Sequence, residues 1–279
     1  MILKSYSKIN LTLRVNKKLK HKKLHDIQSY YCLIDLHDEI NIKATNEAKD
    51  KIKFHGKFAK NVNNSKNSIK STLSILRKRN LVNNYFSILI KKNIPVFGGL
   101  GGGTSNSAFL TKYLVKNNMT KSISDTLSKR IGSDFRLFSH NQGFIQNLSK
   151  NIKLKKKHNL YFALVYPNIR SSTKLVYSKV KKYSPKSSTR NININKKSMF
   201  IKFLAKSNND LQKIVEINYP KIKRLIEEMG QFEGCCFSRL TGSGSVCYGV
   251  FKSRKLAKNA LTKIKLKYPK YWSSFAKTI

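Results

Sequence analysis

One short segment restricts this chain more than any other, because five of six consecutive positions between a predicted strand and a predicted helix are glycine. The composition of residues 85–90 is typical of a strand, and that of residues 105–115 is typical of a helix. So many glycines cost backbone entropy on folding, which disfavours a simple flexible hinge. A backbone without Cβ atoms can approach an anion closely, and the following helix adds its positive N-terminal end. The segment therefore predicts a phosphate-binding loop, with the glycines at Gly98, Gly99, Gly101, Gly102 and Gly103.

Two common phosphate-binding motifs do not describe this loop. A Walker A loop requires Lys after its last glycine, and none is present. The dinucleotide motif G-x-G-x-x-G fails because Thr104 follows Gly101 by three positions, where a glycine is needed. The polar residues Thr104, Ser105 and Asn106 can cap the helix, donate to phosphate or reach a metal ion.

The rest of the chain predicts an α+β protein. The 279 residues are enough for two domains, which we place at 1–152 and 153–279. Residues 160–166 form a nearly continuous apolar run, the pattern of a buried strand. Residues 181–197 are rich in Ser, Asn and Lys and predict a mobile loop. Further strands are expected at 9–15, 28–36, 38–43, 51–54, 235–240 and 245–251, and further helices at 68–79, 123–131, 210–219, 222–229 and 255–266.

The charge is extreme, with 57 Lys and Arg against 13 Asp and Glu, a formal net charge of +44. Such a balance is typical of nucleic-acid-binding proteins, but here the cations are scattered, which favours solvated surface positions instead. The four cysteines form no C-x-x-C pair or zinc-ligand spacing, which fits a reducing compartment. Without a signal segment or an apolar run of about 18 residues, a cytoplasmic protein without a membrane span is expected.

Residues 95–108 resemble the signature P-x-G-x-G-L-G-[GS]-S-[SA]-[SA] of the GHMP kinases. The form G-G-L-G-G-G-[ST]-S-N-[AS]-A is characteristic of the branch that phosphorylates 4-(cytidine 5'-diphospho)-2-C-methyl-D-erythritol in non-mevalonate isoprenoid biosynthesis. The resemblance implies a ribosomal-protein-like N-terminal domain, a ferredoxin-like C-terminal domain, and transfer of the ATP γ-phosphoryl group with Mg²⁺. It implies that ATP binds the whole loop: Pro95, Val96, Phe97, Gly98, Gly99, Leu100, Gly101, Gly102, Gly103, Thr104 and Ser105.

Two segments resemble the family's catalytic motifs. Residues 7–11 are similar to A-K-[IL]-N-L, which implies that Lys8 orients the acceptor hydroxyl and that Asn10 binds substrate. Residues 131–138 are similar to [LI]-G-[AS]-D-[VI]-P-F-F, whose acid is the catalytic base, so Asp134 is expected to take the hydroxyl proton. The family's Pro is Arg136 here, which leaves the position less rigid or gives Arg136 a contact of its own.

Three further segments resemble the family's substrate and nucleotide motifs. His25 falls on a histidine that flanks the cytosine ring with a tyrosine, but Leu24 replaces that tyrosine. Residues 171–174 are similar to a [ST]-T motif, which implies a substrate contact for Thr173. Residues 208–211 are similar to N-D-[LF]. Residues 238–245 are similar to [SA]-x-[ML]-[ST]-G-[ST]-G-[SA], a second glycine turn at Thr241, Gly242, Ser243 and Gly244.

Two alternatives stay open on the sequence. The acceptor could instead be homoserine, mevalonate or a sugar, although His25 and the context of Lys8 favour the cytidine substrate. The chain could also be a basic nucleic-acid-binding protein on a degenerate kinase fold, which the intact Lys8, Asp134 and both glycine turns disfavour. We expect a small-molecule substrate, no protein cage for a metal, no nucleic acid or membrane partner, and a monomer or homodimer.

Overall fold

The computed structural model describes residues 2–19, 24–186 and 195–279, which form two compact units. Unit 1 consists of the residues up to Lys8, Leu36–Val96 and Gly101–Ser139. Unit 2 consists of Ile9–Asp35, Phe97–Leu100 and the described residues of His140–Ile279. The chain passes from one unit to the other within β1 (Ile2–Asn10), within β3 (His25–Thr45) and within the glycine loop. Each unit consists of several separate segments, whereas each of the predicted domains, 1–152 and 153–279, is continuous. These domains stay a prediction.

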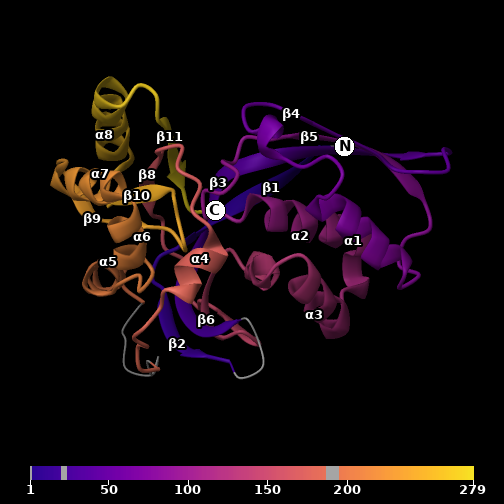
Figure 1. Ribbon diagram of the computed structural model, residues 1–279, viewed down its shortest axis with the longest axis horizontal. Helices are drawn as coiled ribbons and strands as arrows, with labels where there is room; N and C mark the ends of the chain where they lie inside the picture. Colours follow the sequence, from indigo (N-terminus) through magenta and orange to yellow (C-terminus); the bar gives the residue numbers. More distant parts are fainter. Residues whose placement is uncertain (1, 20–23, 187–194) are drawn as a thin grey trace. The chain divides into compact units, whose positions relative to one another are not determined.

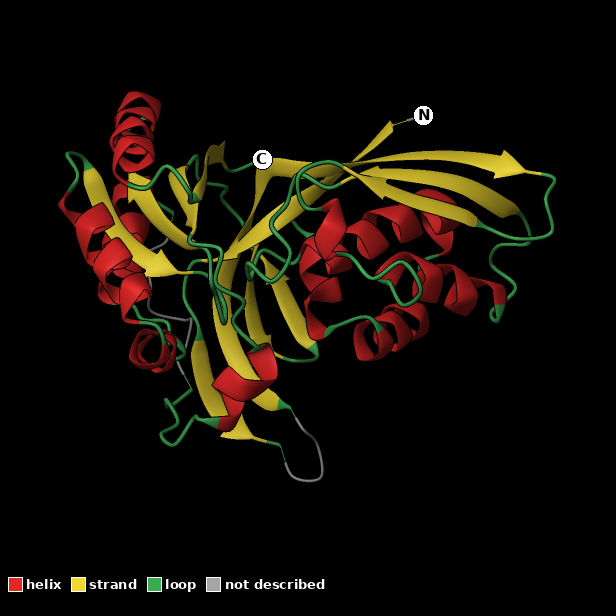
Figure 2. Ribbon diagram, turned by 45° about the horizontal axis from the view of Figure 1, so that its top comes forward, coloured by secondary structure: helices red, strands yellow, loops and turns green. Residues whose placement is uncertain are grey.

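Unit 1 is a sheet with helices packed on one side (Figure 2). Residues 39–45 of β3 pair antiparallel with β5 (Tyr85–Lys91), and β5 pairs parallel with β4 (Lys51–His55). Along β5 buried and exposed residues alternate strictly, as a strand with one covered face requires. The helical segments of this unit are η1 (Ala59–Asn61), α1 (Ser68–Arg77), α2 (Gly102–Val115), η2 (Lys116–Asn118), α3 (Lys121–Arg130) and η3 (Ser133–Ser139).

The first half of β3 belongs to unit 2, where it carries a second group of strands. It pairs antiparallel with β2 (Arg14–Lys18) on one side and with β6 (Gln142–Asn147) on the other. β6 in turn pairs antiparallel with β7 (Lys150–Lys153). Residues 28–36 and 38–43, which the sequence indicates as separate strands, are thus parts of one 21-residue strand.

The C-terminal part of unit 2 is a four-stranded antiparallel sheet in the order β11-β8-β10-β9 (Figure 1). In chain order its strands read 4-1-3-2, with a helix before the second strand and another before the fourth, which is the ferredoxin-like βαββαβ arrangement. The predicted ferredoxin-like domain is therefore confirmed. Its strands are β8 (Tyr161–Tyr166), β9 (Cys235–Leu240), β10 (Cys247–Phe251) and β11 (Trp272–Lys277), and the helices of unit 2 are α4 (Thr173–Ser178), α5 (Lys197–Lys206), α6 (Gln212–Asn218), α7 (Pro220–Gln231) and α8 (Arg254–Lys267).

Apolar residues at the expected periods build this part of the core. All of β10 and all but the first residue of β8 are buried, which accounts for the continuous apolar run in the sequence. Helix α7 buries Ile222, Leu225, Ile226 and Met229, one stripe at helical spacing. Its first residue is Pro220, whose fixed φ suits the start of a helix.

The structure corrects two predictions and adds three strands and two helices. Residues 9–15 are not a single strand, because the N–H groups of Leu11 and Thr12 both turn to the carbonyl oxygen of Tyr30, 2.7 and 3.3 Å away. β1 therefore ends at Asn10 and β2 begins only at Arg14. Helix α2 begins at Gly102 rather than at residue 105. Strands β6, β7 and β11 and helices α4 and α5 were not predicted. The loop predicted at 181–197 lies partly outside the described residues.

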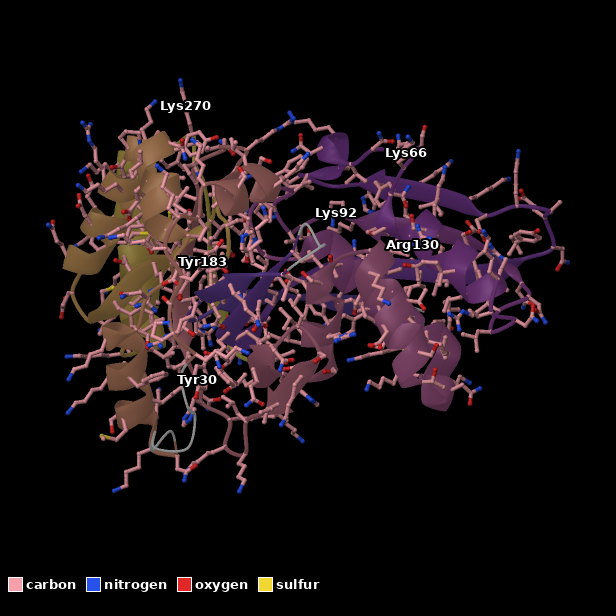
Figure 3. All side chains as sticks on the ribbon, turned by 60° about the horizontal axis from the view of Figure 1, so that its bottom comes forward. Tyr30, Lys66, Lys92, Arg130, Tyr183 and Lys270 are labelled. Atoms are coloured by element: carbon pink, nitrogen blue, oxygen red, sulfur yellow. The ribbon has the colours of Figure 1, made fainter. Side chains whose placement is uncertain are left out.

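Side chains ending in nitrogen extend around both units, as Figure 3 shows, and the labelled Lys66 and Lys270 are among them. The scatter of positive charge in the sequence is thus also a scatter in space. Among the described residues no helix is both long and apolar enough to cross a membrane.

Candidate active site

Lys8 and Asp134 form an ion pair in unit 1, with 3.2 Å between Nζ and Oδ2. Lys8 lies on β1 with only 3% of its side chain exposed, whereas Asp134 lies in η3 with 35% exposed. A half-open carboxylate next to a buried ammonium can accept a proton from an approaching hydroxyl, while the ammonium holds the oxygen. The two residues predicted to be catalytic are thus brought together.

The glycine loop packs directly on this pair. Gly101 has φ +71°, and a Cβ there would stand 3.3 Å from Cε and Cγ of Lys8 and 3.2 Å from Cζ of Phe138. Gly132, just before η3, would place a Cβ 3.2 Å from Oγ1 of Thr104. Thr104 of the loop therefore lies at the turn that carries Asp134.

Helix α2 starts inside the loop and presents donors there. Its first intrahelical hydrogen bond runs from the Ser105 N–H to the Gly101 oxygen, at 2.8 Å. The N–H groups of Gly102, Gly103 and Thr104 precede that bond, so the helix offers them no acceptor, and its positive end lies at the same place. The Ser105 hydroxyl is buried and donates to the Tyr6 oxygen, which ties α2 to β1.

A buried ion pair holds the start of the loop. The Asp38 carboxylate accepts hydrogen bonds from the N–H groups of Asn93 and Ile94, at 2.8 and 2.9 Å, and pairs with Lys92. Asp38 and Lys92 are both buried. No sequence pattern indicates this pair, since one Lys among 57 cationic residues is inconspicuous.

In unit 2 the second glycine turn touches the first. A Cβ on Gly99 would lie 2.6 Å from the oxygen of Thr241 and 2.9 Å from that of Gly244, closer than real side chains come. The Val246 N–H donates to the Gly98 oxygen at 3.0 Å. Gly99, Gly242 and Gly244 all have positive φ, a conformation that glycine adopts without strain. The two segments therefore pack backbone against backbone.

Buried amides fix the second turn. Asn209 donates from its side chain to the oxygens of Leu240 and Gly242, at 2.9 and 2.8 Å. The Asn10 N–H donates to Oγ1 of Thr241 at 3.1 Å, and the Asn10 side chain donates to Oγ of Ser29 at 2.9 Å. Asn10 is thus built into the support of the turn, and Asn209 gains a role that its motif alone did not indicate.

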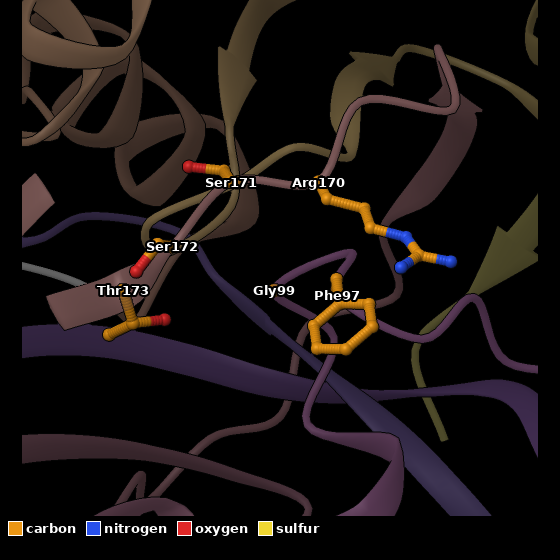
Figure 4. A pocket seen from close by; sticks show the side chains of 7 residues that line it. Phe97, Gly99, Arg170, Ser171, Ser172 and Thr173 are labelled. Atoms are coloured by element: carbon orange, nitrogen blue, oxygen red, sulfur yellow. The ribbon is translucent and has the colours of Figure 1, made fainter. Parts of the chain in front are cut away.

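A cavity of about 370 Å³ lies beside these two segments within unit 2 (Figure 4). Thr173 contributes to its wall and shares a 2.8 Å hydrogen bond with the hydroxyl of Ser243. Arg170, which the sequence motifs did not single out, lies at the cavity with its guanidinium 5.4 Å from the ring centre of Phe97. The lining residues are Phe97, Gly99, Arg170, Ser171, Ser172, Thr173 and Gly244.

His25 lies in an aromatic group of unit 2. Its ring stacks on Tyr177 of α4 with 5.1 Å between centroids and 30° between planes, and Tyr183 follows at 6.3 Å. Burial, together with the positive charge of Lys18, holds the pKa of His25 below its ordinary value. Leu24, at the position of the family's tyrosine, is 47% exposed. The aromatic neighbours of His25 are instead two tyrosines that are distant in sequence.

Arg136 forms an ion pair with Asp125 of α3, so it does have a contact of its own.

Over residues 2–19, 24–186 and 195–279 no group of three His, Cys, Asp or Glu could hold a metal ion. Mg²⁺ that is bound mainly by phosphates and water needs no such group, and the oxygens of Asp134 and Thr104 suit it.

Comparison with known proteins agrees with this geometry. The family model described as GHMP kinases C terminal matches residues 192–270. A crystal structure of 4-(cytidine 5'-diphospho)-2C-methyl-D-erythritol kinase aligns with a TM-score of 0.76 at 20% identity, covering 100% of both chains. The mevalonate kinase of Methanococcus jannaschii aligns with a TM-score of 0.65 at 20% identity, over 100% of this chain and 98% of that one. The fold is that of the GHMP kinases.

Closer relatives narrow the class. The 4-diphosphocytidyl-2-C-methyl-D-erythritol kinase of Pelagibacter ubique (strain HTCC1062) is 36% identical over 99% of this chain and 98% of its own length. The enzyme of that name from Wolbachia pipientis wMel is 29% identical over 97% and 96%. The chain belongs to the 4-diphosphocytidyl-2-C-methyl-D-erythritol kinase family.

Proposed function

We propose that the protein transfers the γ-phosphoryl group of ATP to the 2-hydroxyl of 4-(cytidine 5'-diphospho)-2-C-methyl-D-erythritol, a step of isopentenyl diphosphate biosynthesis. The observation that carries the proposal is the 3.2 Å pair of Lys8 and Asp134 directly under the glycine loop. Membership of the family supports the choice of substrate, because a relative that is named for this substrate aligns over 99% of this chain.

Lys8 and Asp134 carry the proton transfer. The Asp134 carboxylate takes the proton of the acceptor hydroxyl as its oxygen attacks the γ-phosphorus. The Lys8 ammonium holds that oxygen and stabilises the negative charge that develops on it. Because Lys8 is buried and Gly101 lies on its stem, the ammonium is held in position before the substrate arrives.

The start of helix α2 binds the phosphates of ATP. The N–H groups of Gly102, Gly103 and Thr104 supply donors, and the end of the helix supplies a favourable potential for anions. Mg²⁺, when bound to the triphosphate next to Thr104 and Asp134, would neutralise part of the phosphate charge. The full loop from Pro95 to Ser105 stays our proposal for the ATP site, with the Ser105 side chain acting as an anchor.

The acceptor side lies on residues of unit 2. The ring stack of His25 and Tyr177 offers an aromatic surface for the cytosine, and a lowered pKa keeps His25 neutral near pH 7. Thr173 offers a hydroxyl at the cavity that the second glycine turn also lines. Asn10 supports that turn, so we place it behind the substrate rather than in direct contact. A cytoplasmic location remains part of the proposal.

Mass spectrometry of the product tests the proposed function. Purified protein, ATP, Mg²⁺ and the cytidine-diphospho substrate should yield a product heavier by one phosphoryl group, whereas homoserine, mevalonate or galactose should yield none. The Asp134→Asn variant serves as the control for a contaminating kinase. Folded wild-type protein that phosphorylates one of the other acceptors instead would refute the choice of substrate.

A further inference from the structure

Arg170 lies outside all the segments that resemble family motifs. It is exposed, it precedes the buried Ser171, and its guanidinium carbon lies 5.4 Å from the centre of the Phe97 ring. An arginine over an aromatic face is attracted to the ring and loses part of its conformational freedom. Figure 4 shows the guanidinium beside Phe97, with the hydroxyls of Ser172 and Thr173 on the other side of Gly99.

The cavity next to Arg170 has rigid walls. The Ser171 hydroxyl donates to the Ser243 oxygen at 2.8 Å, and the Ser245 hydroxyl donates to the oxygen of Ile169. The first glycine segment joins through the hydrogen bond from the Val246 N–H to the Gly98 oxygen. Three chain segments are therefore hydrogen-bonded to one another around the cavity, so a ligand would meet a site that is already formed.

The lining residues suit a phosphate group. They comprise one cation, three hydroxyl residues, two glycines and a phenylalanine, with no carboxylate among the seven. A guanidinium can donate two parallel hydrogen bonds to a phosphate, and the Ser172 hydroxyl, which accepts from the Leu175 N–H, keeps a proton to donate as well. Gly99 and Gly244 contribute only backbone to the lining.

The direction of helix α4 favours the cytidine substrate over ATP as the source of that phosphate. Thr173 at the cavity and Tyr177 at the His25 stack are four positions apart, so they share one face of the helix. Their backbones are separated by about 6 Å along the helix axis. This spacing allows a nucleotide with its base on Tyr177 to place its phosphates near Thr173 and Arg170.

We propose that Arg170, oriented by Phe97, binds the diphosphate of the cytidine substrate. This inference rests on the proposed function for the identity of the ligand. It adds a substrate-binding residue that neither glycine turn nor any catalytic motif includes. The fork of the guanidinium, rather than its charge alone, makes the contact, so lysine at this position should replace it only in part.

Calorimetric titration with cytidine 5'-diphosphate and with cytidine, without turnover, tests the role of Arg170. Arg170→Ala should weaken cytidine diphosphate binding about tenfold or more and leave cytidine binding unchanged, with Arg170→Lys between the two. Arg254→Ala is the matched control, because Arg254 lies 5.5 Å from the ring centre of Phe275, outside the cavity. This control should bind like the wild type.

Two results would overturn the proposal. Equal binding of cytidine diphosphate by wild type and Arg170→Ala would show that Arg170 makes no phosphate contact. A loss of ATP affinity in Arg170→Ala, with cytidine diphosphate unaffected, would assign the phosphate to ATP instead. A turnover assay on the same wild-type preparation separates this question from the proposed function, because product formation and the Arg170 effect on binding are measured independently.

Discussion

The backbone of Gly101 lies against the side chain of Lys8, since a Cβ at Gly101 would stand 3.3 Å from both Cε and Cγ of the lysine. This contact joins the glycine loop to the pair of Lys8 and Asp134, to which we assign the proton transfer. A displaced loop would therefore also displace the ammonium that we assign to the acceptor oxygen. Gly101 also has φ +71°, so two independent reasons require glycine there.

Replacing Gly101 with alanine should destabilise the protein and slow catalysis. The positive φ costs about 1–2 kcal/mol for a residue with a Cβ, and the crowded Lys8 adds to that cost. Gly103→Ala is the matched control. Gly103 lies in helix α2, and a Cβ there would meet only Oγ of Ser68, at 3.6 Å. Alanine favours helix by about 1 kcal/mol over glycine, so the control should be as stable as wild type or more stable. Equal free energies of unfolding in urea for the two variants would contradict this interpretation.

Local and long-range features differed in how far the sequence could predict them. The glycine loop and the turn around Asp134 are short motifs whose residues are neighbours in the chain, and the structure does bring Asp134 to Lys8. The break between β1 and β2 depends on a carbonyl of Tyr30, which a pattern of alternating residues cannot reveal. The aromatic partner of His25 is similarly hidden, because 13 tyrosines were candidates and only folding selects Tyr177.

Removing the charge of Asp38 should be strongly destabilising. Asp38→Asn would leave Lys92 buried without its counter-ion and weaken the hydrogen bonds to Asn93 and Ile94, so we expect a loss of about 3–5 kcal/mol in the free energy of unfolding. The neighbouring Glu39→Gln breaks a partly exposed pair with Lys91, 3.5 Å long, and should cost at most about 1 kcal/mol. Denaturant titration of both variants measures the difference, and similar losses would disprove the anchoring role of Asp38.

Tyr177 should matter for the cytidine substrate and not for ATP. Tyr177→Leu removes the ring that stacks on His25, and base–aromatic stacking contributes about 1–3 kcal/mol, so KM for the cytidine substrate should rise at least about fivefold. Tyr271→Leu is the comparison, because it removes a ring stacked on Tyr268 elsewhere in unit 2, at 5.0 Å. Steady-state kinetics on both substrates decides the point. A rise in the ATP KM of Tyr177→Leu would count against the assignment.

The lowered pKa of His25 predicts how the protein responds to acid. Folding favours the neutral ring, so the folded protein binds fewer protons at this site than the unfolded chain does. Stability from this group is complete above the ordinary histidine pKa of about 6.5 and decreases as the pH falls below it. An NMR titration of the His25 ring should give a midpoint below 6.5. A midpoint above 6.5 would show that the ring is stabilised in its charged form.

Arg136 should have a structural contact but little influence on the reaction. Its ion pair with Asp125 is partly exposed, so Arg136→Ala should cost no more than about 1 kcal/mol of stability. The rate of phosphoryl transfer should stay within about twofold of wild type, because we assign the proton transfer to Asp134 alone. A large loss of kcat with normal stability would give Arg136 a catalytic contact.

The rate of phosphoryl transfer in a single turnover shows whether Asp134 is the base that Lys8 holds in place. Rapid-quench measurement with enzyme in excess over both substrates follows the chemical step without product release. The Asp134→Asn variant keeps the size of the side chain, and its rate should fall by about 10² to 10⁴ while its ATP affinity stays near that of wild type. A wild-type rate in the folded Asp134→Asn variant would contradict the account.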